Sequence, residues 1–181
     1  MKTFITSDTH FSHYNIIKFN ERPFTSILEM NNTMIENWNN VVSKEDNVYH
    51  LGDVGFGNPK IINEILYKLN GNIHLIVGNH EKTTLSNKNS CDRFIWIKDY
   101  FQMKYRGLDE KEYFFVMSHY PFLTWNRSHY GSISLHGHCH SKDNTKDVRR
   151  FDVGVDANNF TPVDIEYIIN FFKNSPVTKH H

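Results

Sequence analysis

The stretch Val48-Tyr49-His50-Leu51-Gly52-Asp53 decides how this chain is to be interpreted. It is a short apolar run that stops at a glycine and ends on a carboxylate. Short apolar runs bounded by glycine or polar residues are typical of buried strands. The run therefore predicts a buried strand that delivers a charged side chain at its carboxyl end.

The same pattern of an apolar run followed by a polar cluster occurs five times along the chain. The clusters are Asp8-Thr9-His10, Gly52-Asp53, Gly78-Asn79-His80-Glu81, Ser118-His119 and Gly137-His138-Cys139-His140. Ligands of open α/β sheets bind beyond the carboxyl ends of the strands, so we expect the five clusters to meet at one rim. Asp, His and Asn gathered at one place indicate a metal site.

Composition places the chain among ordinary globular proteins. It has 181 residues, 39% hydrophobic and 22% charged, enough for one domain with a real core, which we place at residues 1–177. Lys and Arg together number 20, as do Asp and Glu, so the formal net charge is zero. A global attraction to nucleic acid is therefore not expected, although a local basic patch stays open.

Cysteine content and hydropathy indicate a soluble cytoplasmic protein. Two cysteines, Cys91 and Cys139, do not make a disulfide framework in a chain of this size. No run approaches the roughly 18–20 apolar residues of a membrane span, and Asp8 and His10 interrupt the N-terminal apolar run that a signal peptide needs. We take residues 178–181, which include His180 and His181, as a C-terminal tail and a candidate tag remnant.

Periodicity predicts an α/β fold with two kinds of strand connection. Expected strands are Thr3–Ser7, Asn47–Leu51, Ile73–Val77, Tyr113–Met117, Ser132–His136 and Phe151–Val155. Apolar residues at spacings of three and four predict helices over about 26–42, 61–69 and 164–172. The alternating first half predicts parallel pairing, whereas the turn-rich second half favours antiparallel pairing. A mixed sheet, or two packed sheets flanked by helices, fits both halves.

The ligand types favour a pair of hard or borderline metal ions. Carboxylate, imidazole and amide oxygen suit Mn²⁺, Fe or Zn²⁺ better than copper(I) or an iron–sulfur centre. A catalytic zinc typically uses three protein ligands, so the seven candidates suit two ions with one carboxylate bridging them. Ions in such sites lie roughly 3.5–4 Å apart. The seven are Asp8, His10, Asp53, Asn79, His119, His138 and His140.

The spacing within two of the clusters predicts where their side chains point. Asp8 and His10 are two residues apart, as are His138 and His140, and an extended backbone would point each pair to one side. Cys139 would then point away from the metals.

These clusters, in this order, resemble the motifs of the calcineurin-like metallophosphoesterases, and their flanks resemble a small bacterial and phage branch of that family. The resemblance implies a four-layer αββα sandwich of two mixed sheets, with a dimetal site at the sheet edge. It implies two divalent ions per chain, with Mn²⁺ preferred and Fe, Zn or Ni as alternatives. By the same match Asp53 bridges the ions. Asp8, His10 and His140 complete one set of ligands, and Asn79, His119 and His138 the other.

The resemblance also assigns catalytic roles to His80 and Glu81. His80 would steady the transferring phosphoryl group and protonate the leaving oxygen, and Glu81 would hold His80 in orientation. The expected reaction is hydrolysis of a phosphoester by a water that bridges the metals and attacks phosphorus in line. An imidazole suits the acid role because its ordinary pKa lies near neutrality.

Three further residues are candidates for substrate contact. His13 could reach a substrate phosphate, although a surface or helix-capping role fits it equally. Arg22 could bind a phosphate oxygen through its guanidinium, or be a solvated neighbour of Pro23. Arg127 could line the mouth of the pocket.

The sequence leaves several functions open. We expect a phosphodiesterase that acts on small phosphodiesters or nucleotides. A phosphomonoesterase or nucleotidase is the first alternative, and a nuclease the second, although zero net charge and no evident basic stripe argue against nucleic acid. A non-catalytic metal-binding scaffold is a third. Substrate identity and oligomeric state are not specified by the sequence.

Overall fold

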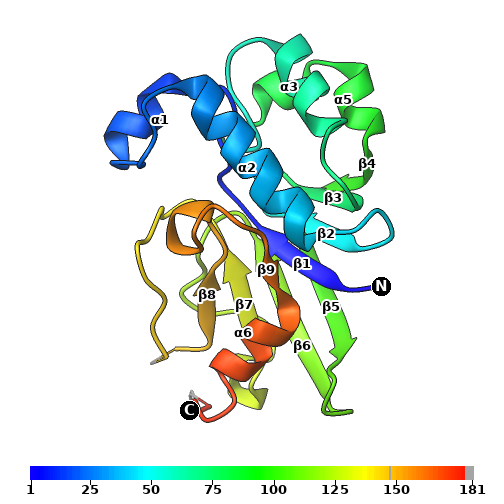
Figure 1. The fold of residues 1–181 in the computed structure, drawn as a ribbon. Coiled ribbons are helices and arrows are strands. Elements are labelled where there is room, and N and C mark those ends of the chain that lie inside the picture. Colours follow the sequence, from blue (N-terminus) through cyan, green and yellow to red (C-terminus); the bar gives the residue numbers. More distant parts are fainter. Residues whose placement is uncertain (147, 178–181) are drawn as a thin grey trace.

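The computed structural model describes residues 1–146 and 148–177, and two mixed β-sheets form its framework (Figure 1). The first sheet has the strand order β4-β3-β2-β1-β9. Its strands are β1 (Thr3–Thr6), β2 (Asn47–His50), β3 (Asn72–Ile76), β4 (Phe94–Lys98) and β9 (Val163–Asp164). Strands β1 to β4 pair in parallel and β9 joins β1 antiparallel, which confirms the parallel pairing expected for the first half.

The second sheet has the order β5-β6-β7-β8 and differs from expectation in its pairing. Its strands are β5 (Tyr100–Arg106), β6 (Glu112–Ser118), β7 (Ile133–His136) and β8 (Arg150–Asp152). Only the hairpin β5–β6 is antiparallel; β6–β7 and β7–β8 pair in parallel. Long loops, rather than tight turns, connect these parallel strands, and such loops allow crossovers that short connections forbid.

Helices lie against both sheets, which confirms the expected fold class. Those that precede β4 gather on one side of the first sheet, and α6 lies over the second (Figure 1). They are α1 (Tyr14–Phe19), α2 (Ile27–Val41), α3 (Pro59–Leu66), α4 (Lys82–Leu85), α5 (Lys88–Asp92) and α6 (Ile165–Phe171). Single turns of 3₁₀ helix occur at η1 (Ser128–Tyr130) and η2 (Val155–Ala157).

Polar side chains define where the longer helices begin. Ser26, Asn58 and Asp164 each accept a hydrogen bond from a backbone N–H of the first turn of α2, α3 and α6. Such caps satisfy N–H groups that have no partner within the helix. The helical periods expected from the sequence therefore match real helices to within a few residues at each end.

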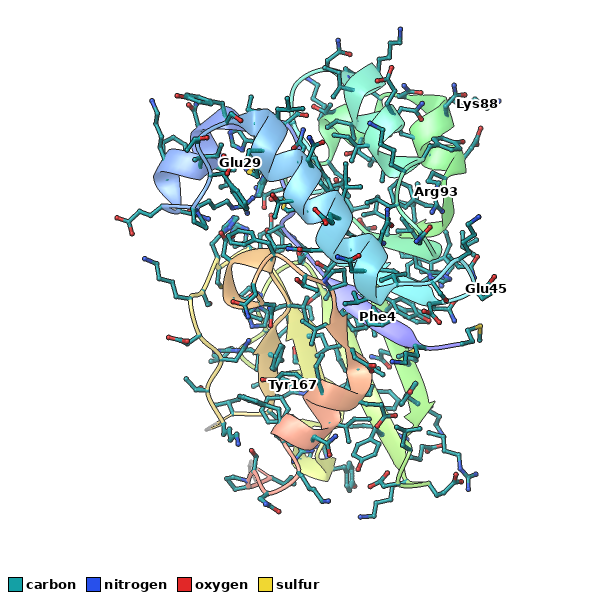
Figure 2. All side chains as sticks on the ribbon, in the orientation of Figure 1. Phe4, Glu29, Glu45, Lys88, Arg93 and Tyr167 are labelled. Atoms are coloured by element: carbon teal, nitrogen blue, oxygen red, sulfur yellow. The ribbon has the colours of Figure 1, made fainter. Side chains whose placement is uncertain are left out.

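Two apolar clusters hold the layers together. Met34 and Trp38 of α2 and Ile62 of α3 pack with Phe4 and Val48 of the first sheet. A second cluster joins the other face of this sheet to the second sheet and α6. It includes Ile5, Leu51, Phe115, Leu135, Phe151 and Ile168. Tyr167 of α6, labelled in Figure 2, meets Phe151 edge-on at 6.4 Å between ring centroids. Alternate residues of β1 and β2 thus serve opposite faces, as strand geometry requires.

No helix among the described residues is long and apolar enough to cross a membrane. The tail expected at 178–181 lies outside the described residues.

Candidate metal centre

The loops that follow five strands meet at one edge of the sheets and carry all seven expected ligands. Backbone hydrogen bonds join the loops directly: Asp8 N–H donates to Gly52 O at 2.9 Å and His10 N–H donates to Asp53 O at 3.0 Å. Gly137 N–H donates to His119 O at 3.0 Å in the same way. The structure therefore brings the five clusters together, as the strand-end pattern predicts.

Close approach of these loops requires glycine at two positions. A Cβ on Gly52, whose φ is +99°, would lie 2.6 Å from Gly78 Cα. A Cβ on Gly137 would lie 2.1 Å from Ser7 Oγ and 2.2 Å from Asp8 Oδ2. Any side chain at either position would push the ligand loops apart.

Most of the candidate ligands adopt a left-handed backbone rather than the extended one expected from their spacing. Positive φ values between 48° and 67° occur at Asp8, His10, Asp53, His138 and His140. This conformation is uncommon outside glycine, and it persists where surrounding contacts hold it. The concentration of such residues at one edge is characteristic of a functional site.

Asp8, His10 and His140 form the first group of ligand atoms. One atom from each lies within 4.8 Å of the others. His10 Nε2 lies 3.9 Å from Asp8 Oδ1, and His140 Nε2 lies 3.8 Å from the same oxygen. Ligands bound at about 2.0–2.2 Å to one ion lie about 3–4 Å from each other. These separations therefore suit a shared ion.

Asp53, Asn79, His119 and His138 form the second group. Asn79 Oδ1 lies 2.8 Å from His119 Nε2 and 2.9 Å from His138 Nδ1. Asp53 Oδ2 lies 3.7 Å from His119 Nε2 and 3.6 Å from His10 Nε2 of the first group. This oxygen thus stands between the two groups, which is where a bridging carboxylate belongs.

Buried polar atoms without partners show that the residues fit metal ions. Asp8 Oδ1 and both ring nitrogens of His10 are buried and make no hydrogen bond. His119 Nδ1 lies 2.8 Å from Leu51 O and must donate to it, so in the neutral ring Nε2 has a lone pair that faces Asn79 Oδ1. Lone pairs that converge in this way suit a cation between them.

Burial also sets the charge states of the first group. Burial raises the pKa of Asp8 to about 7, against the opposing effects of His140 and of hydrogen bonds from Ser7 and His138. Burial, reinforced by nearby cationic groups, lowers the pKa of His10 to about 2, so its ring is neutral. A neutral imidazole is the form that binds metal, and a bound cation would favour the ionised Asp8.

Glu81 occupies a different position from the one expected. Its Oε2 accepts hydrogen bonds from Asp53 N–H at 2.8 Å and Gly78 N–H at 3.1 Å, and its Oε1 accepts from Val54 N–H at 3.0 Å. No hydrogen bond among the described residues joins it to the ring of His80. Glu81 therefore ties the loop after β3 to the loop after β2, instead of orienting His80 directly.

Both predictions for Arg22 are wrong, because its guanidinium is neither solvated nor free to bind a substrate phosphate. Its side chain is fully buried, and its Nε and Nη2 donate to the two oxygens of Asp156, each at 2.8 Å. Nη2 and Nη1 also donate to Asp8 O at 2.8 Å and Thr9 O at 3.0 Å. Since the guanidinium is committed to these partners, Arg22 supports the site from behind.

Asp156 is the residue of the site that sequence reasoning missed. Its Oδ2 lies 2.8 Å from His140 Nδ1, which leaves Nε2 of that ring free to bind metal. Burial opposes ionisation, but His140 and Arg22 together lower the pKa of Asp156 to about 2. Asp156 lies in η2, outside the five clusters, but it directly follows the expected strand Phe151–Val155, so the strand-end pattern could have indicated it.

His13 and Phe56 form an aromatic wall beside His80. The ring of His13 stacks on Phe56 with centroids 4.3 Å apart and an interplanar angle of 14°. The ring centroid of His80 lies 5.4 Å from that of Phe56 and 5.8 Å from that of His10. His80 N–H donates to Asp53 Oδ1 at 2.7 Å, so the backbone of His80 is fixed against the ligand cluster while its side chain is exposed. His13 thus lies at the site, where the sequence placed it as a candidate.

Arg127 lies at the opposite end of the second sheet, and its expected place at the pocket mouth is wrong. Its guanidinium covers the ring of Phe114 at 4.8 Å. Phe114 lies in β6, five residues before His119, which follows the end of that strand. Five residues of extended strand place the two about 16 Å apart. The loop 120–131 runs back along the sheet, which sequence proximity to His138 did not reveal.

A cavity of about 520 Å³ lies on the other side of His140 from the ligand atoms. Arg22, Asp156 and His140 line it together with the exposed side chain of Phe19. It is separate from the aromatic wall of His13 and Phe56.

Comparison with known proteins agrees with this arrangement. The family model described as calcineurin-like phosphoesterase matches residues 1–170. An uncharacterized protein of Methanocaldococcus jannaschii is 35% identical over 98% of this chain and 95% of its own length. The gene 66 protein of Mycobacterium phage D29 is 29% identical over 88% of this chain and 90% of its own.

Among solved structures, a protein of unknown function from Aquifex aeolicus is 26% identical, with a TM-score of 0.68 over 93% of this chain and 98% of its own. Its fold is therefore shared along nearly the whole length. The matching family model, together with the gathered ligand groups, shows that this chain belongs to the calcineurin-like phosphoesterases and is a metal-dependent phosphoester hydrolase.

Proposed function

We propose that the chain is a phosphodiesterase that hydrolyses small phosphodiesters or nucleotides with two divalent ions. The observation that carries the proposal is the position of Asp53 Oδ2, 3.6 Å from His10 Nε2 and 3.7 Å from His119 Nε2. One carboxylate oxygen equidistant from two groups of lone pairs supports a shared ligand between two ions.

In this proposal Asp53 serves both ions. Asp8, His10 and His140 complete the first set of ligands, and Asn79, His119 and His138 complete the second. Two divalent ions bound there would supply Lewis acidity toward the phosphoryl oxygens and make water a better nucleophile at neutral pH. The carboxylate, imidazole and amide donors favour Mn²⁺, with Fe, Zn²⁺ and Ni²⁺ as alternatives.

His80 is the proposed acid. Its backbone is anchored to Asp53, and its exposed ring stands over the rim close to His10. A phosphoester seated at the ligand cluster would bring its leaving oxygen to this ring. His80 donates a proton to that oxygen as the phosphorus–oxygen bond breaks, which prevents the release of a strongly basic alkoxide.

The exposed surroundings of the ligand cluster support a diester. Tyr120 is 49% exposed beside His119 and His138, and Phe56 is 36% exposed beside His80. Organic groups therefore have room on two sides of the phosphorus. Zero formal net charge supports a small substrate over a nucleic acid. The free Cys91 and Cys139 support a reducing, cytoplasmic compartment.

The test is a panel assay on protein stripped of metal and then loaded with Mn²⁺, Zn²⁺, Ni²⁺ or Mg²⁺. Matched nucleotide monoesters and diesters serve as substrates, and Asp53→Asn is the control because it removes the shared carboxylate. We expect two ions per chain and faster hydrolysis of diesters. Two bound ions without hydrolysis of any ester would favour a scaffold, and a steep loss of affinity with salt would favour a nuclease.

A further inference from the structure

The loop Gly55-Phe56-Gly57 presents an exposed aromatic ring next to the proposed acid. Its backbone is fixed, because Phe56 N–H donates to Phe11 O at 2.8 Å and Gly55 forms a bridge with Phe11. A Cβ on Gly55 would lie 2.5 Å from Ile62 Cδ1, so the loop lies tightly on α3. The ring of Phe56 is therefore held in place by its backbone and by stacking on His13.

The position of this ring relative to His80 specifies what it can contact. A leaving oxygen that takes a proton from His80 must lie within about 3 Å of a ring nitrogen. The carbon skeleton attached to that oxygen then lies beside whatever flanks His80. Phe56 flanks it, with ring centroids 5.4 Å apart, and 36% of the side chain remains exposed.

The wall consists of two flat rings, because His13 and Phe56 lie nearly parallel, with an interplanar angle of 14°. Such a surface favours a flat, unsaturated partner that can stack on it.

We propose that Phe56, backed by His13, is the specificity-determining wall that stacks on a flat, unsaturated leaving group, such as a nucleoside or an aryl alcohol. The proposal rests on the proposed function, because it takes the proton donor to be His80. It adds the chemical class of the leaving group, which neither the family nor the metal ligands specify.

The test uses two phosphodiesters that share a retained group and differ in the leaving alcohol. One leaving group is a phenol and the other a fluorinated alkanol of matched acidity, so intrinsic reactivity is equal. Phe56→Ala should lower kcat/KM for the aryl ester about three- to tenfold, the size of one aromatic contact. The alkyl ester should change by less than about twofold. Phe56→Tyr should keep the aryl preference, and metal content should stay unchanged.

Phe56→Leu covers the case in which the alanine variant does not fold, since leucine keeps an apolar contact with His13. It should also lose the aryl preference. The matched control is Phe19→Ala, an exposed aromatic in the cavity on the far side of His140. Aryl-selective loss in Phe19→Ala, or equal loss for both esters in Phe56→Ala and Phe56→Leu, would overturn the proposal. Failure of the wild type on both esters would instead overturn the proposed function.

Discussion

The guanidinium of Arg22 donates two hydrogen bonds of 2.8 Å to the carboxylate of Asp156, and both side chains are buried. The same carboxylate holds Nδ1 of His140 at 2.8 Å. Arg22 therefore fixes Asp156, and Asp156 fixes the tautomer and orientation of the His140 ring, a proposed metal ligand. In other proteins, mutation of a residue that hydrogen-bonds to a metal ligand typically lowers metal affinity about 10–100-fold.

Asp156→Asn should weaken binding of the ion on the His140 side about 10–100-fold. The amide cannot supply the negative charge that stabilises the hydrogen bond to His140, although it keeps the size of the side chain. Titration calorimetry with Mn²⁺ on metal-stripped protein measures the change. Glu21→Gln is the control, because Glu21 pairs with Lys142 on the exposed surface and should leave affinity unchanged. Equal affinities for Asp156→Asn and wild type would contradict the role of Asp156.

His80→Ala should retain both metal ions and lose most of its turnover. The variant removes a ring that the ligand cluster does not need, since only the backbone N–H of His80 bonds to Asp53. A positioned general acid contributes about 10²–10⁴-fold, and we expect kcat to fall within that range. Elemental analysis gives the metal content and steady-state kinetics the rate. The loss should be smaller for esters with acidic leaving groups, and full activity would exclude the acid role.

Glu81→Ala should destabilise the fold rather than act on chemistry alone. It leaves two buried backbone N–H groups, at Asp53 and Val54, and a part-buried one at Gly78 without an acceptor. Unsatisfied buried donors cost about 1–3 kcal/mol each, so we expect a loss of roughly 2 kcal/mol or more. Urea unfolding measures it. Glu81→Gln keeps one carbonyl acceptor and should lose less, whereas a loss of well under about 1 kcal/mol in Glu81→Ala would show that the three hydrogen bonds matter little.

Local patterns predicted the parts of this molecule that depend on neighbours in sequence. The apolar period alone predicted α2 to within one residue at each end. The strand-end clusters predicted that the seven proposed ligands gather at one edge, because ligands of α/β sheets bind beyond the carboxyl ends of the strands. Asp8 and Asp53 could be placed together in this way without any knowledge of loop conformation.

Residues whose role depends on loop paths could not be predicted. Arg22 and Arg127 both lie in loops between the polar clusters and carry the same guanidinium, yet one lies beneath the site and the other at the far end of β6. Asp156 directly follows the expected strand Phe151–Val155, but it is a lone carboxylate with no second polar ligand type beside it, and the real strand β8 already ends at Asp152. Glu81 was tied to His80 by adjacency, whereas a turn after Gly78 directs its carboxylate toward the backbone of the neighbouring loop. The path that each loop takes after its strand ends determines where these four side chains lie, and local sequence patterns do not specify that path.

His50 is buried in a hydrogen-bonded position behind the metal loops, where it must stay neutral. Gly52 N–H donates to its Nδ1 at 3.2 Å, so Nε2 carries the hydrogen and donates to Thr9 Oγ1 at 3.0 Å. Thr9 in turn donates to Val54 O at 2.7 Å. Burial, assisted by the charge of His119, lowers the pKa of His50 to about 3. A proton on the second nitrogen would break the bond from Gly52.

Metal-free protein should therefore lose stability through His50 as the pH falls below about 6.5, the ordinary histidine pKa. Between that pH and about 3 the unfolded chain binds a proton at His50 that the folded chain rejects, so the free energy of unfolding decreases as the pH decreases. From pH 7 to 5 the wild type should lose roughly 1–2 kcal/mol more than His50→Gln, which cannot titrate. Urea unfolding in the presence of a chelator measures both. The control is His129→Gln, at an exposed histidine, which should lose as much unfolding free energy between pH 7 and 5 as the wild type. If His50→Gln also loses as much as the wild type, the folded protein accepts a proton on His50 and the buried network is not rigid.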